Sequence, residues 1–237
     1  MSINFPDLSS GVPVTFERTL PTDLRLAVQQ AKPRKTGLYR NRVKRVLDVA
    51  AVLVTAPVVV PVIAALALCI RRDGSDAFYT QPRVGRGGRN FRMWKLRSMV
   101  PDADARLESY LSGNPAARNE WNRTQKLKDD PRITRFGRFL RRSSLDELPQ
   151  LWNVLKGDMS LVGPRPMMIS QTSLYPGMAY YALRPGITGH WQTAGRNSTT
   201  FEARAEYDAV YETDLSLATD MRILARTVGV VVKATGY

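Results

Sequence analysis

The chain is organised around one stretch, DDPRITRFGRFLRRSSLDELPQLWNVLKGDMSLVGPRP, which runs from residue 129 to residue 166. It places two adjacent carboxylates, Asp146 and Glu147, between a group of arginines and a Pro-Arg-Pro corner. Ser144 and Glu147 have the spacing of a capping box, and an apolar run at helical spacing follows them. Because Pro149 is tolerated only in the first turn of a helix, Asp146 is the alternative cap. Both interpretations place the carboxylates at a helix N-terminus, where the dipole favours their ionised form.

A carboxylate pair at a helix start is most often a pair of ordinary capping residues. Two features favour a binding site instead. Basic residues flank the pair on both sides, among them Arg141 and Arg165, and a doubly phosphorylated substrate needs such charge. Pro164 and Pro166 restrict the backbone around Arg165. We therefore expect Arg165 to act as a stiff clamp on an anionic ligand.

Three ordered motifs connect the chain to a known family. They are SLDELPQLWNVLKGDMSLVGPRP at 144–166, FRMWKLRSM at 91–99 and RPGITG at 184–189. Together they resemble the monotopic phosphoglycosyl transferases, which are bacterial enzymes that move a hexose-1-phosphate from a UDP-sugar to polyprenyl phosphate. The resemblance covers about residues 40 to 237. It implies the small form of the family, which has no N-terminal multi-span domain.

The resemblance also implies a mechanism. Asp146 would attack the β-phosphate of the UDP-sugar, UMP would leave, and polyprenyl phosphate would then attack the phosphosugar held on Asp146. Glu147 would be the Mg²⁺ ligand. Residues 175–196 would help to shape the nucleotide-sugar pocket. The candidate substrate-binding residues are Lys95, Arg97, Arg141, Arg165 and Arg196.

Composition narrows the chemistry independently of any motif. The chain has 237 residues, 35 basic and 21 acidic residues, and a net charge of +14. This excess indicates an anionic partner such as nucleic acid, an anionic membrane surface or a phosphorylated small molecule. Cys69 is the single cysteine and His190 the single histidine, which excludes a zinc site, an iron–sulfur cluster and a Cys–His dyad. Carboxylates are left to carry the chemistry, with an oxygen-bound Mg²⁺ as the expected metal.

Residues 1–42 are expected to form a loosely ordered tail without a signal peptide. Seven basic residues and no acidic ones lie between Lys32 and Arg45, directly before an apolar run. Such a segment is typical of the cytoplasmic flank of a membrane helix.

Residues 43–72 are expected to enter the membrane and return. The uncharged stretch from Val49 to Ile70 would be about 33 Å long as a straight helix, which is just enough to span a bilayer. However, Pro57 and Pro61 lie inside it, and basic residues flank both of its ends. These signals favour a re-entrant helix with a proline break. A single transmembrane span is the alternative, because kinked helices also cross membranes.

Residues 73–237 are expected to form a cytoplasmic catalytic domain. Ala77 to Gln81 and Asn90 to Leu96 predict a β-hairpin that places Lys95 and Arg97 near the site. Asp102 and Asp104 could form the Asp-X-Asp metal site of a nucleotide-sugar glycosyltransferase. Since they follow a proline at the start of a predicted helix, we interpret them as ordinary first-turn residues.

Three further elements are predicted in the second half of the chain. The run around Phe136, Phe139 and Leu140 predicts a basic amphipathic helix, which would lie either at the membrane interface or against the core. Ile187 to Thr193 predicts a short strand. Ser216 to Lys233 predicts a structural helix that ends at Gly236, with one apolar face. That face comprises Ala218, Met221, Leu224, Val228 and either Val231 or Val232.

The sequence thus predicts a mostly helical α+β enzyme at the cytoplasmic face of the bacterial inner membrane. It would begin the assembly of exopolysaccharide or another surface glycan. Its partners would be a UDP-sugar, polyprenyl phosphate and the bilayer, without nucleic acid; whether it forms a homo-oligomer is left open. The competing hypotheses are a Leloir-type glycosyltransferase built on Asp102 and Asp104, and a membrane-anchored basic protein that binds anionic lipid or nucleic acid without catalysis.

Overall fold

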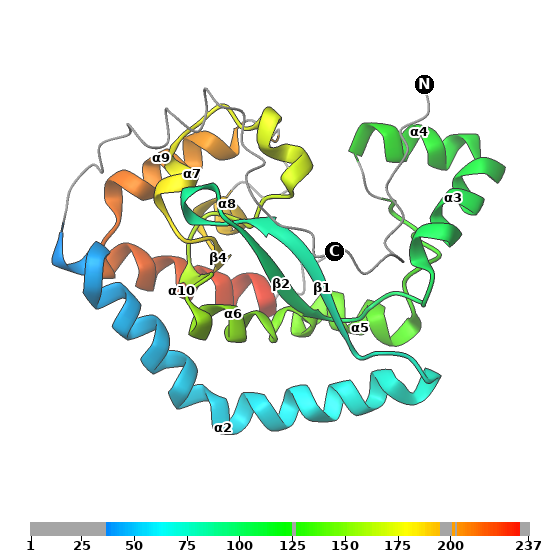
Figure 1. The fold of residues 1–237 in the computed structure, drawn as a ribbon, viewed down its shortest axis with the longest axis horizontal. Helices are drawn as coiled ribbons and strands as arrows, with labels where there is room; N and C mark the ends of the chain where they lie inside the picture. The colour runs from blue at the N-terminus through cyan, green and yellow to red at the C-terminus, as the bar shows by residue number, and fades with distance from the viewer. Residues whose placement is uncertain (1–36, 125–126, 195–200, 202, 233–237) are drawn as a thin grey trace.

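The computed structural model describes residues 37–124, 127–194, 201 and 203–232 (Figure 1). Most of these residues are helical, and a small antiparallel hairpin is present, as predicted. A two-stranded parallel pair is also present, which the sequence did not predict. Residues 1–36, which make up most of the predicted tail, lie outside the described residues.

The described elements follow one another in a simple order. In the first half they are the π-helical turn η1 (Tyr39–Val43), α2 (Lys44–Ile70), the 3-10 turn η2 (Arg71–Asp73), β1 (Phe78–Val84), η3 (Arg86–Gly88), β2 (Asn90–Leu96), α3 (Ala103–Gly113), α4 (Pro115–Thr124) and α5 (Arg135–Ser143). The second half contains η4 (Leu145–Glu147), α6 (Gln150–Lys156), β3 (Ser160–Val162), η5 (Ile169–Leu174), α7 (Ala179–Ala182), β4 (Gly186–Thr188), α8 (His190–Ala194), α9 (Arg204–Asp214) and α10 (Leu217–Val232).

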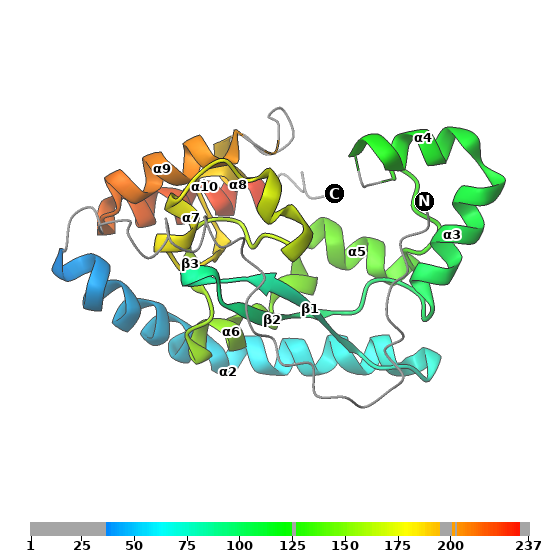
Figure 2. The same ribbon diagram turned by 45° about the horizontal axis from the view of Figure 1, so that its top comes forward.

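The hairpin lies at the centre of the molecule, with α2 along one edge (Figures 1 and 2). Helices α7 to α10 gather near the turn of the hairpin, whereas α3 and α4 project on the opposite side. This arrangement leaves α5 and α6 next to the middle of the molecule, on either side of the turn that carries the carboxylates.

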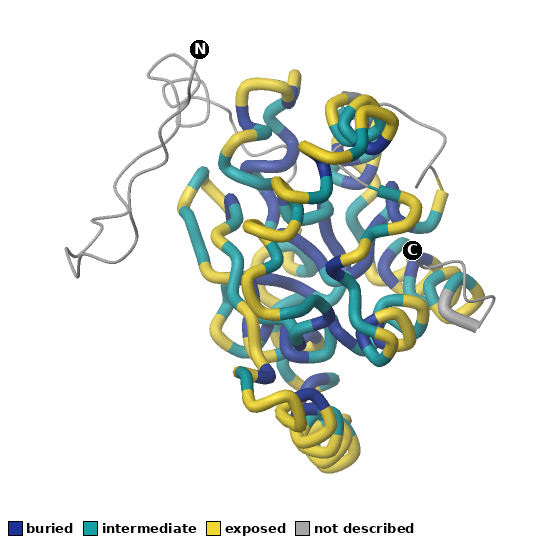
Figure 3. Tube along the Cα trace, turned by 90° about the vertical axis from the view of Figure 1, so that its right-hand side faces the viewer, coloured by how far each residue is buried: buried dark blue, intermediate teal, exposed yellow. Residues whose placement is uncertain are grey.

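Helix α2 is the long apolar helix that the sequence predicted. The segment Tyr39–Asp73 is long and apolar enough to cross a membrane by length and composition alone. Its surface is mostly exposed (Figure 3), and its buried residues are Asp48, Val52, Ala67 and Ile70. The helix continues through Pro57 and Pro61, so the predicted break does not interrupt it. Figure 1 shows the ribbon of α2 changing direction along its length, but a re-entrant path stays a prediction.

The first half of α2 is attached to the rest of the molecule by polar contacts. Lys44 forms an ion pair with the buried Asp220 of α10, with its Nζ 2.6 Å from Oδ2. Asp48 is buried and accepts a 2.6 Å hydrogen bond from Ser160 Oγ of β3. Arg45 donates to the carbonyl oxygens of Val154 and Leu155 at the end of α6. Buried polar groups of this kind require partners, so these contacts fix where α2 begins.

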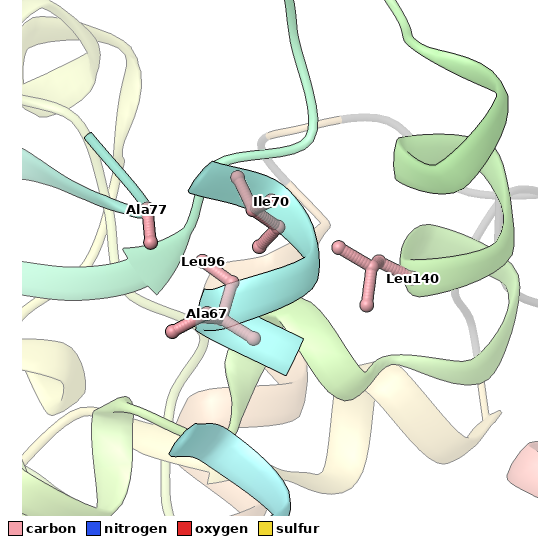
Figure 4. Packing of buried hydrophobic residues seen from close by; sticks show 5 residues of the cluster. All are labelled: Ala67, Ile70, Ala77, Leu96 and Leu140. Carbon is pink, nitrogen blue, oxygen red and sulfur yellow. The ribbon is translucent and has the colours of Figure 1, made fainter. Parts of the chain in front are cut away.

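The second half of α2 ends in an apolar cluster (Figure 4). Ala67 and Ile70 of α2 pack with Ala77, with Leu96 at the end of β2 and with Leu140 of α5. Leu140 is fully buried, whereas Phe139 of the same helix is 52% exposed. Leu140 thus packs against the core, as one of the two alternatives predicted, whereas a position of α5 at the membrane interface stays a prediction.

The predicted hairpin is confirmed, with Phe78 opposite Leu96 in an antiparallel register. Its position depends on Asn153 of α6, which is completely buried. The Asn153 carboxamide accepts a 3.0 Å hydrogen bond from the Trp94 amide and donates one of 2.7 Å to the Arg92 carbonyl. These bonds are made to backbone groups of β2, which pairs with β1 on its other side, and they hold the hairpin against α6.

Two predictions for the second half were wrong in detail. The strand expected at 187–193 is confined to Gly186–Thr188, and His190–Ala194 forms a helix. Directly after β4 the backbone of Gly189 lies so close to Gly163 that only glycine fits, because a Cβ on Gly189 would lie 2.0 Å from the carbonyl oxygen of Gly163.

The predicted helix at 216–233 is present as α10, but its buried face differs from the predicted one. Asp220 and Ile223 are buried, whereas Met221 and Val228 are exposed and Leu224 is half-buried. The polar contacts of Asp220 set this orientation, since a buried carboxylate needs its partners. Residues 233–237, including the predicted end at Gly236, lie outside the described residues.

Candidate active site

Asp146 and Glu147 lie in the turn between α5 and α6. Ser144 opens the turn with a left-handed backbone (φ 57°), and Leu145–Glu147 then form a single 3-10 turn. No side-chain cap is present there, and α6 begins only at Gln150. The predicted capping box was therefore wrong, because a left-handed Ser144 turns the chain too sharply for its hydroxyl to cap the next helix. The carboxylates precede the helix and are held by side chains from other elements.

Lys95 of β2 is the closest cation to the pair. Its Nζ lies 2.8 Å from Glu147 Oε1 and 3.8 Å from Asp146 Oδ2. Because Asn153 fixes β2 against α6, this lysine is held in place by the fold as well as by its charge. The structure thus brings together Lys95, Asp146 and Glu147, as the sequence predicted.

Arg141 approaches from α5. Its Nε donates a 2.8 Å hydrogen bond to Ser98 Oγ, and its charge acts on Asp146. A close approach of α5 to residue 98 makes this possible, because a Cβ on Gly137 would lie 1.9 Å from the Ser98 carbonyl oxygen. Only a glycine allows that approach.

Burial determines the electrostatics of Asp146, which is 7% exposed. Burial raises the pKa of Asp146 above its usual range and Glu147 raises it further, while the charges of Lys95 and Arg141 lower it. The expectation that the local backbone would favour the ionised form is therefore overturned, since desolvation of the carboxylate is the larger effect. A carboxylate that is costly to ionise, yet flanked by two cations, is suited to react with an electrophile.

The other predicted ligands lie in different places. Arg165 contacts the Trp191 ring, with its Cζ 5.7 Å from the ring centroid. Arg97 is directed away from the pair, because its guanidinium binds Asp73 at 2.6 and 2.8 Å and the Asp76 carbonyl. Arg196 lies outside the described residues.

Asp102 and Asp104 stand at the start of α3, as the sequence predicted for ordinary helix-start residues. Within the described part of the chain, no group of three or more His, Cys, Asp or Glu side chains is placed to hold a metal ion. This leaves the Asp146–Glu147 pair as the candidate site for a cation.

The carboxylate pair meets the requirements of Mg²⁺ only with a contribution from substrate. Mg²⁺ is commonly held by one or two carboxylates together with substrate phosphates and water. Asp146 and Glu147 can supply those carboxylates, with Lys95 already paired to Glu147. The donor set therefore fits a cation that arrives with a phosphorylated ligand, and it does not fit a cage made of protein alone.

An apolar groove of about 300 Å³ begins next to the pair. Leu148 and Pro149, which directly follow Glu147, form one end of its lining, and Trp152 of α6 and Trp94 of β2 contribute further. The remaining lining comes largely from α2, including Val59 and Ile63. A smaller cavity of about 30 Å³ lies among Lys44, Arg184 and Tyr211, and neither Asp146 nor Glu147 lines it.

Three functional candidates were not found from the sequence. Asn153 positions Lys95 indirectly, and a buried Asn in an apolar helix was the available signal. Arg83 of β1 and Arg204 of α9 lie near Arg165, as their mutual electrostatic effects show. No local pattern distinguishes these two arginines from the many exposed ones.

Comparisons with known proteins identify the family of the chain. The model of the family described as bacterial sugar transferase matches residues 39–234. The chain therefore belongs to the bacterial sugar transferase family.

Individual relatives show how much of such proteins the chain represents. It is 46% identical over 195 residues to the UDP-galactose-lipid carrier transferase of Erwinia amylovora and 44% identical over 195 residues to the undecaprenyl-phosphate galactose phosphotransferase of Salmonella typhimurium. Each alignment covers 81% of this chain and 41% of the relative, so the chain spans about two fifths of their length. It is 39% identical over 210 residues to the exopolysaccharide production protein ExoY of Sinorhizobium fredii, with 86% of this chain and 93% of that protein covered.

Proposed function

We propose that this protein transfers a hexose-1-phosphate from a UDP-sugar to polyprenyl phosphate and so begins the synthesis of exopolysaccharide or a related surface glycan. The observation that carries the proposal is the buried Asp146, which is flanked by Lys95 and Arg141 and lies two residues before Leu148, which lines an apolar groove. The names of the relatives from Erwinia and Salmonella, which include a lipid carrier and undecaprenyl phosphate, support it.

In the first step, a carboxylate oxygen of Asp146 attacks the β-phosphorus of the UDP-sugar. The bond between that phosphorus and the bridging oxygen breaks, UMP departs, and the sugar phosphate is left on Asp146. The attack brings an anion to a diphosphate, so the approach has to be neutralised. Lys95 and Arg141 supply positive charge on the Asp146 side.

In the second step, a phosphate oxygen of polyprenyl phosphate attacks the phosphorus of the phosphosugar. The acyl phosphate bond breaks and regenerates the Asp146 carboxylate. The isoprenoid chain of this acceptor would lie in the groove along Trp152 and α2, which places its phosphate near Leu148 and Pro149. Since the two reactants use the carboxylate in turn, the soluble donor and the lipid acceptor need not meet.

Mg²⁺ would be held by Glu147 together with the diphosphate of the donor. When bound, it supplies charge neutralisation of the phosphate oxygens. The role of Glu147 is then to orient that charge, and Lys95 holds Glu147 in place before the donor arrives.

The contacts of α2 support a re-entrant path at the cytoplasmic face. Lys44 and Asp48, near its start, are bonded to α10 and β3, and its end packs on β2 and α5. Both ends of α2 are therefore attached to the same globular domain. Attachment of both ends to one domain favours a path that enters the bilayer and returns on the same side. The basic residues at both flanks of α2 favour the cytoplasmic side for these two ends.

Trapping of the covalent intermediate tests the proposal. With UDP-sugar and Mg²⁺ but no acceptor, the peptide that contains Asp146 should gain a hexose phosphate, which rapid quenching and peptide mass spectrometry detect. Asp146→Asn should form no adduct and release no UMP. Because burial raises the pKa of Asp146, adduct formation in the wild type should be faster at pH 8 than at pH 5.

The same assay separates the competing hypotheses. A Leloir-type enzyme would release UDP in place of UMP, and a non-catalytic basic protein would release neither nucleotide. An Asp146→Asn protein that still releases UMP at a wild-type rate would show that Asp146 only shapes its turn.

A further inference from the structure

A cluster of three arginines, Arg83, Arg165 and Arg204, lies beyond the carboxylate pair; we refer to it as the arginine cluster. The Arg204 guanidinium lies 4.2 Å from the centroid of the Trp191 ring, and that of Arg165 lies 5.7 Å from it. Arg204 also contacts the Phe201 ring at 4.5 Å. Both guanidiniums thus contact the same indole ring, as cation–π contacts allow, and the charge of Arg165 acts on Arg204.

The third arginine is brought in by the backbone. The Val84 amide donates a 3.0 Å hydrogen bond to the Met167 carbonyl, which joins β1 to the chain just after Arg165. Arg83 directly precedes Val84, and its Nη2 donates to Gln81 Oε1 on the same strand. The cluster is therefore built by β1, α9 and the Pro-Arg-Pro corner, and its members do not come from one helix surface.

Like charges so placed repel one another. Burial and the neighbouring Arg165 lower the pKa of Arg83 and of Arg204 to about 10. Within the described residues, none of the three forms a salt bridge. The Nε atoms of Arg83 and Arg204 are buried and make no hydrogen bond there. Three half-buried guanidiniums with spare donors are a costly arrangement unless an anion offsets their charge.

The cluster lies on the reactive side of the hairpin. Directly opposite residues of an antiparallel pair share a face, and side chains two apart along a strand do too. Lys95 pairs with Tyr79, so Lys95 and Arg83 project from the same face. Glu147 acts electrostatically on Arg83, which places the cluster within reach of the carboxylates.

From this geometry we infer that the arginine cluster binds the phosphate of the departing nucleotide, so that Arg83 and Arg204 act together with Arg165 as donor-binding residues. The identity of this anion rests on the proposed function. The donor diphosphate would extend from Asp146 towards the cluster, whereas the apolar groove would hold the acceptor lipid. Guanidiniums bind phosphate oxygens by paired hydrogen bonds, which lysine cannot reproduce.

Calorimetric titration of the detergent-solubilised full chain with UMP tests the inference. Arg83→Gln and Arg204→Gln should each weaken UMP binding about tenfold or more, the scale of one lost charge-assisted hydrogen bond. Arg204→Lys should weaken it as well, although it keeps the charge. Arg89→Gln, which alters an exposed arginine beside the turn of the same hairpin, is the matched control and should bind UMP normally.

Steady-state kinetics distinguish the two phosphates that the site could hold. The variants should raise KM for the UDP-sugar and leave KM for a short-chain polyprenyl phosphate unchanged. A rise in the acceptor KM with normal UMP affinity would assign the cluster to the lipid phosphate and overturn the inference. Normal UMP affinity and normal KM values in Arg83→Gln and in Arg204→Lys would reduce the cluster to a structural role.

Failure of this inference can be distinguished from failure of the proposed function. If the wild type releases no UMP from any UDP-sugar but binds UMP through the cluster, the proposed reaction fails and the anion site stands. If the wild type turns over and the variants bind UMP normally, the reaction stands and the site fails. Thermal unfolding of each variant shows whether it is folded, and Arg83→Gln replaces Arg204→Gln if the latter is not.

Discussion

At the scale of single residues, the site depends on the contrast between a buried Asp146 and a less buried Glu147. Asp146 is 7% exposed, and its ionised form is stabilised mainly by the charges of Lys95 and Arg141. Glu147 is paired with Lys95 and remains more accessible. The two neighbours in sequence are therefore suited to different tasks, one to react and the other to hold charge.

Glu147→Gln tests that division. The substitution keeps the shape of the side chain but removes the charge that would hold Mg²⁺, so we expect activity to fall by about a hundredfold or more. Asp104→Asn, at the start of α3, is the control and should have nearly normal activity. The rate of UMP release measures both variants, and a normal rate in Glu147→Gln would remove this residue from the site.

Asp208 of α9 gives a second prediction, on stability. Burial raises its pKa to about 7, although a hydrogen bond from Tyr175 and the charge of Arg204 lower it. Since its unfolded pKa is near 4, the folded state binds the proton more tightly, and stability is lost as pH rises from about 4 to 7.

Asp208→Asn keeps an acceptor for Tyr175 and removes the titration. The free energy of unfolding of the variant minus that of the wild type should therefore increase between pH 5 and pH 8, by an amount on the order of a few kcal/mol. The difference between their Tm values should rise in the same direction. Asp214→Asn, an exposed position on the same helix, should show no such trend in thermal unfolding. A difference that is flat with pH would show that Asp208 is ionised throughout.

At the scale of elements, α2 gives the sharpest test. Single cysteines at Gly37 and at Ser75, in a Cys69→Ser background, should both react with a membrane-impermeant thiol reagent from the cytoplasmic side only. A cysteine at Val58, which is exposed on the middle of α2, should be shielded by lipid. Labelling of Gly37→Cys from the outside would show that α2 spans the bilayer. Replacing Pro57 and Pro61 by leucine should send part of the population across.

The elements also show what the sequence could predict. The hairpin and α10 follow from local alternation and helical spacing, so both were found. The turn at Ser144 and the short β4 depend on contacts between distant segments, such as the approach of Gly189 to Gly163, and no local pattern encodes these. The apolar stripe predicted for α10 is not its buried face, because the buried Asp220 decides which side of the helix faces inward.

The candidate site divides in the same way. Asp146, Glu147 and Lys95 were predicted because motifs and the hairpin mark them, and the structure brings them together. Arg97 was expected beside them because it lies two residues after Lys95. It turns away because its guanidinium binds Asp73 of η2, the turn that follows α2. Arg83 and Arg204 join Arg165 only through tertiary structure, so sequence spacing gave no indication of them.

At the scale of the whole molecule, Asp220 connects the beginning of the described chain to its end. Its carboxylate accepts 2.6 Å hydrogen bonds from Tyr39, Lys44 and Tyr211. Asp220→Asn should lower the free energy of unfolding by about 3 kcal/mol or more, because it leaves the half-buried Lys44 without its counterion. Asp214→Asn is again the control, and chemical denaturation measures both. A loss below 1 kcal/mol would mean that the attachment of α2 does not depend on this residue.

The same contact sets an order of events during synthesis. Lys44 and Asp220 are 176 residues apart, so a ribosome releases the apolar helix long before it makes the residue that holds its first turns. The contacts of Arg45 with α6 and of Asp48 with β3 can form earlier in synthesis, and α10 then adds the ion pair to Lys44. The attachment of α2 to the globular domain is therefore complete only after α10 has been made, and a chain truncated before α10 would lack the ion pair between Lys44 and Asp220.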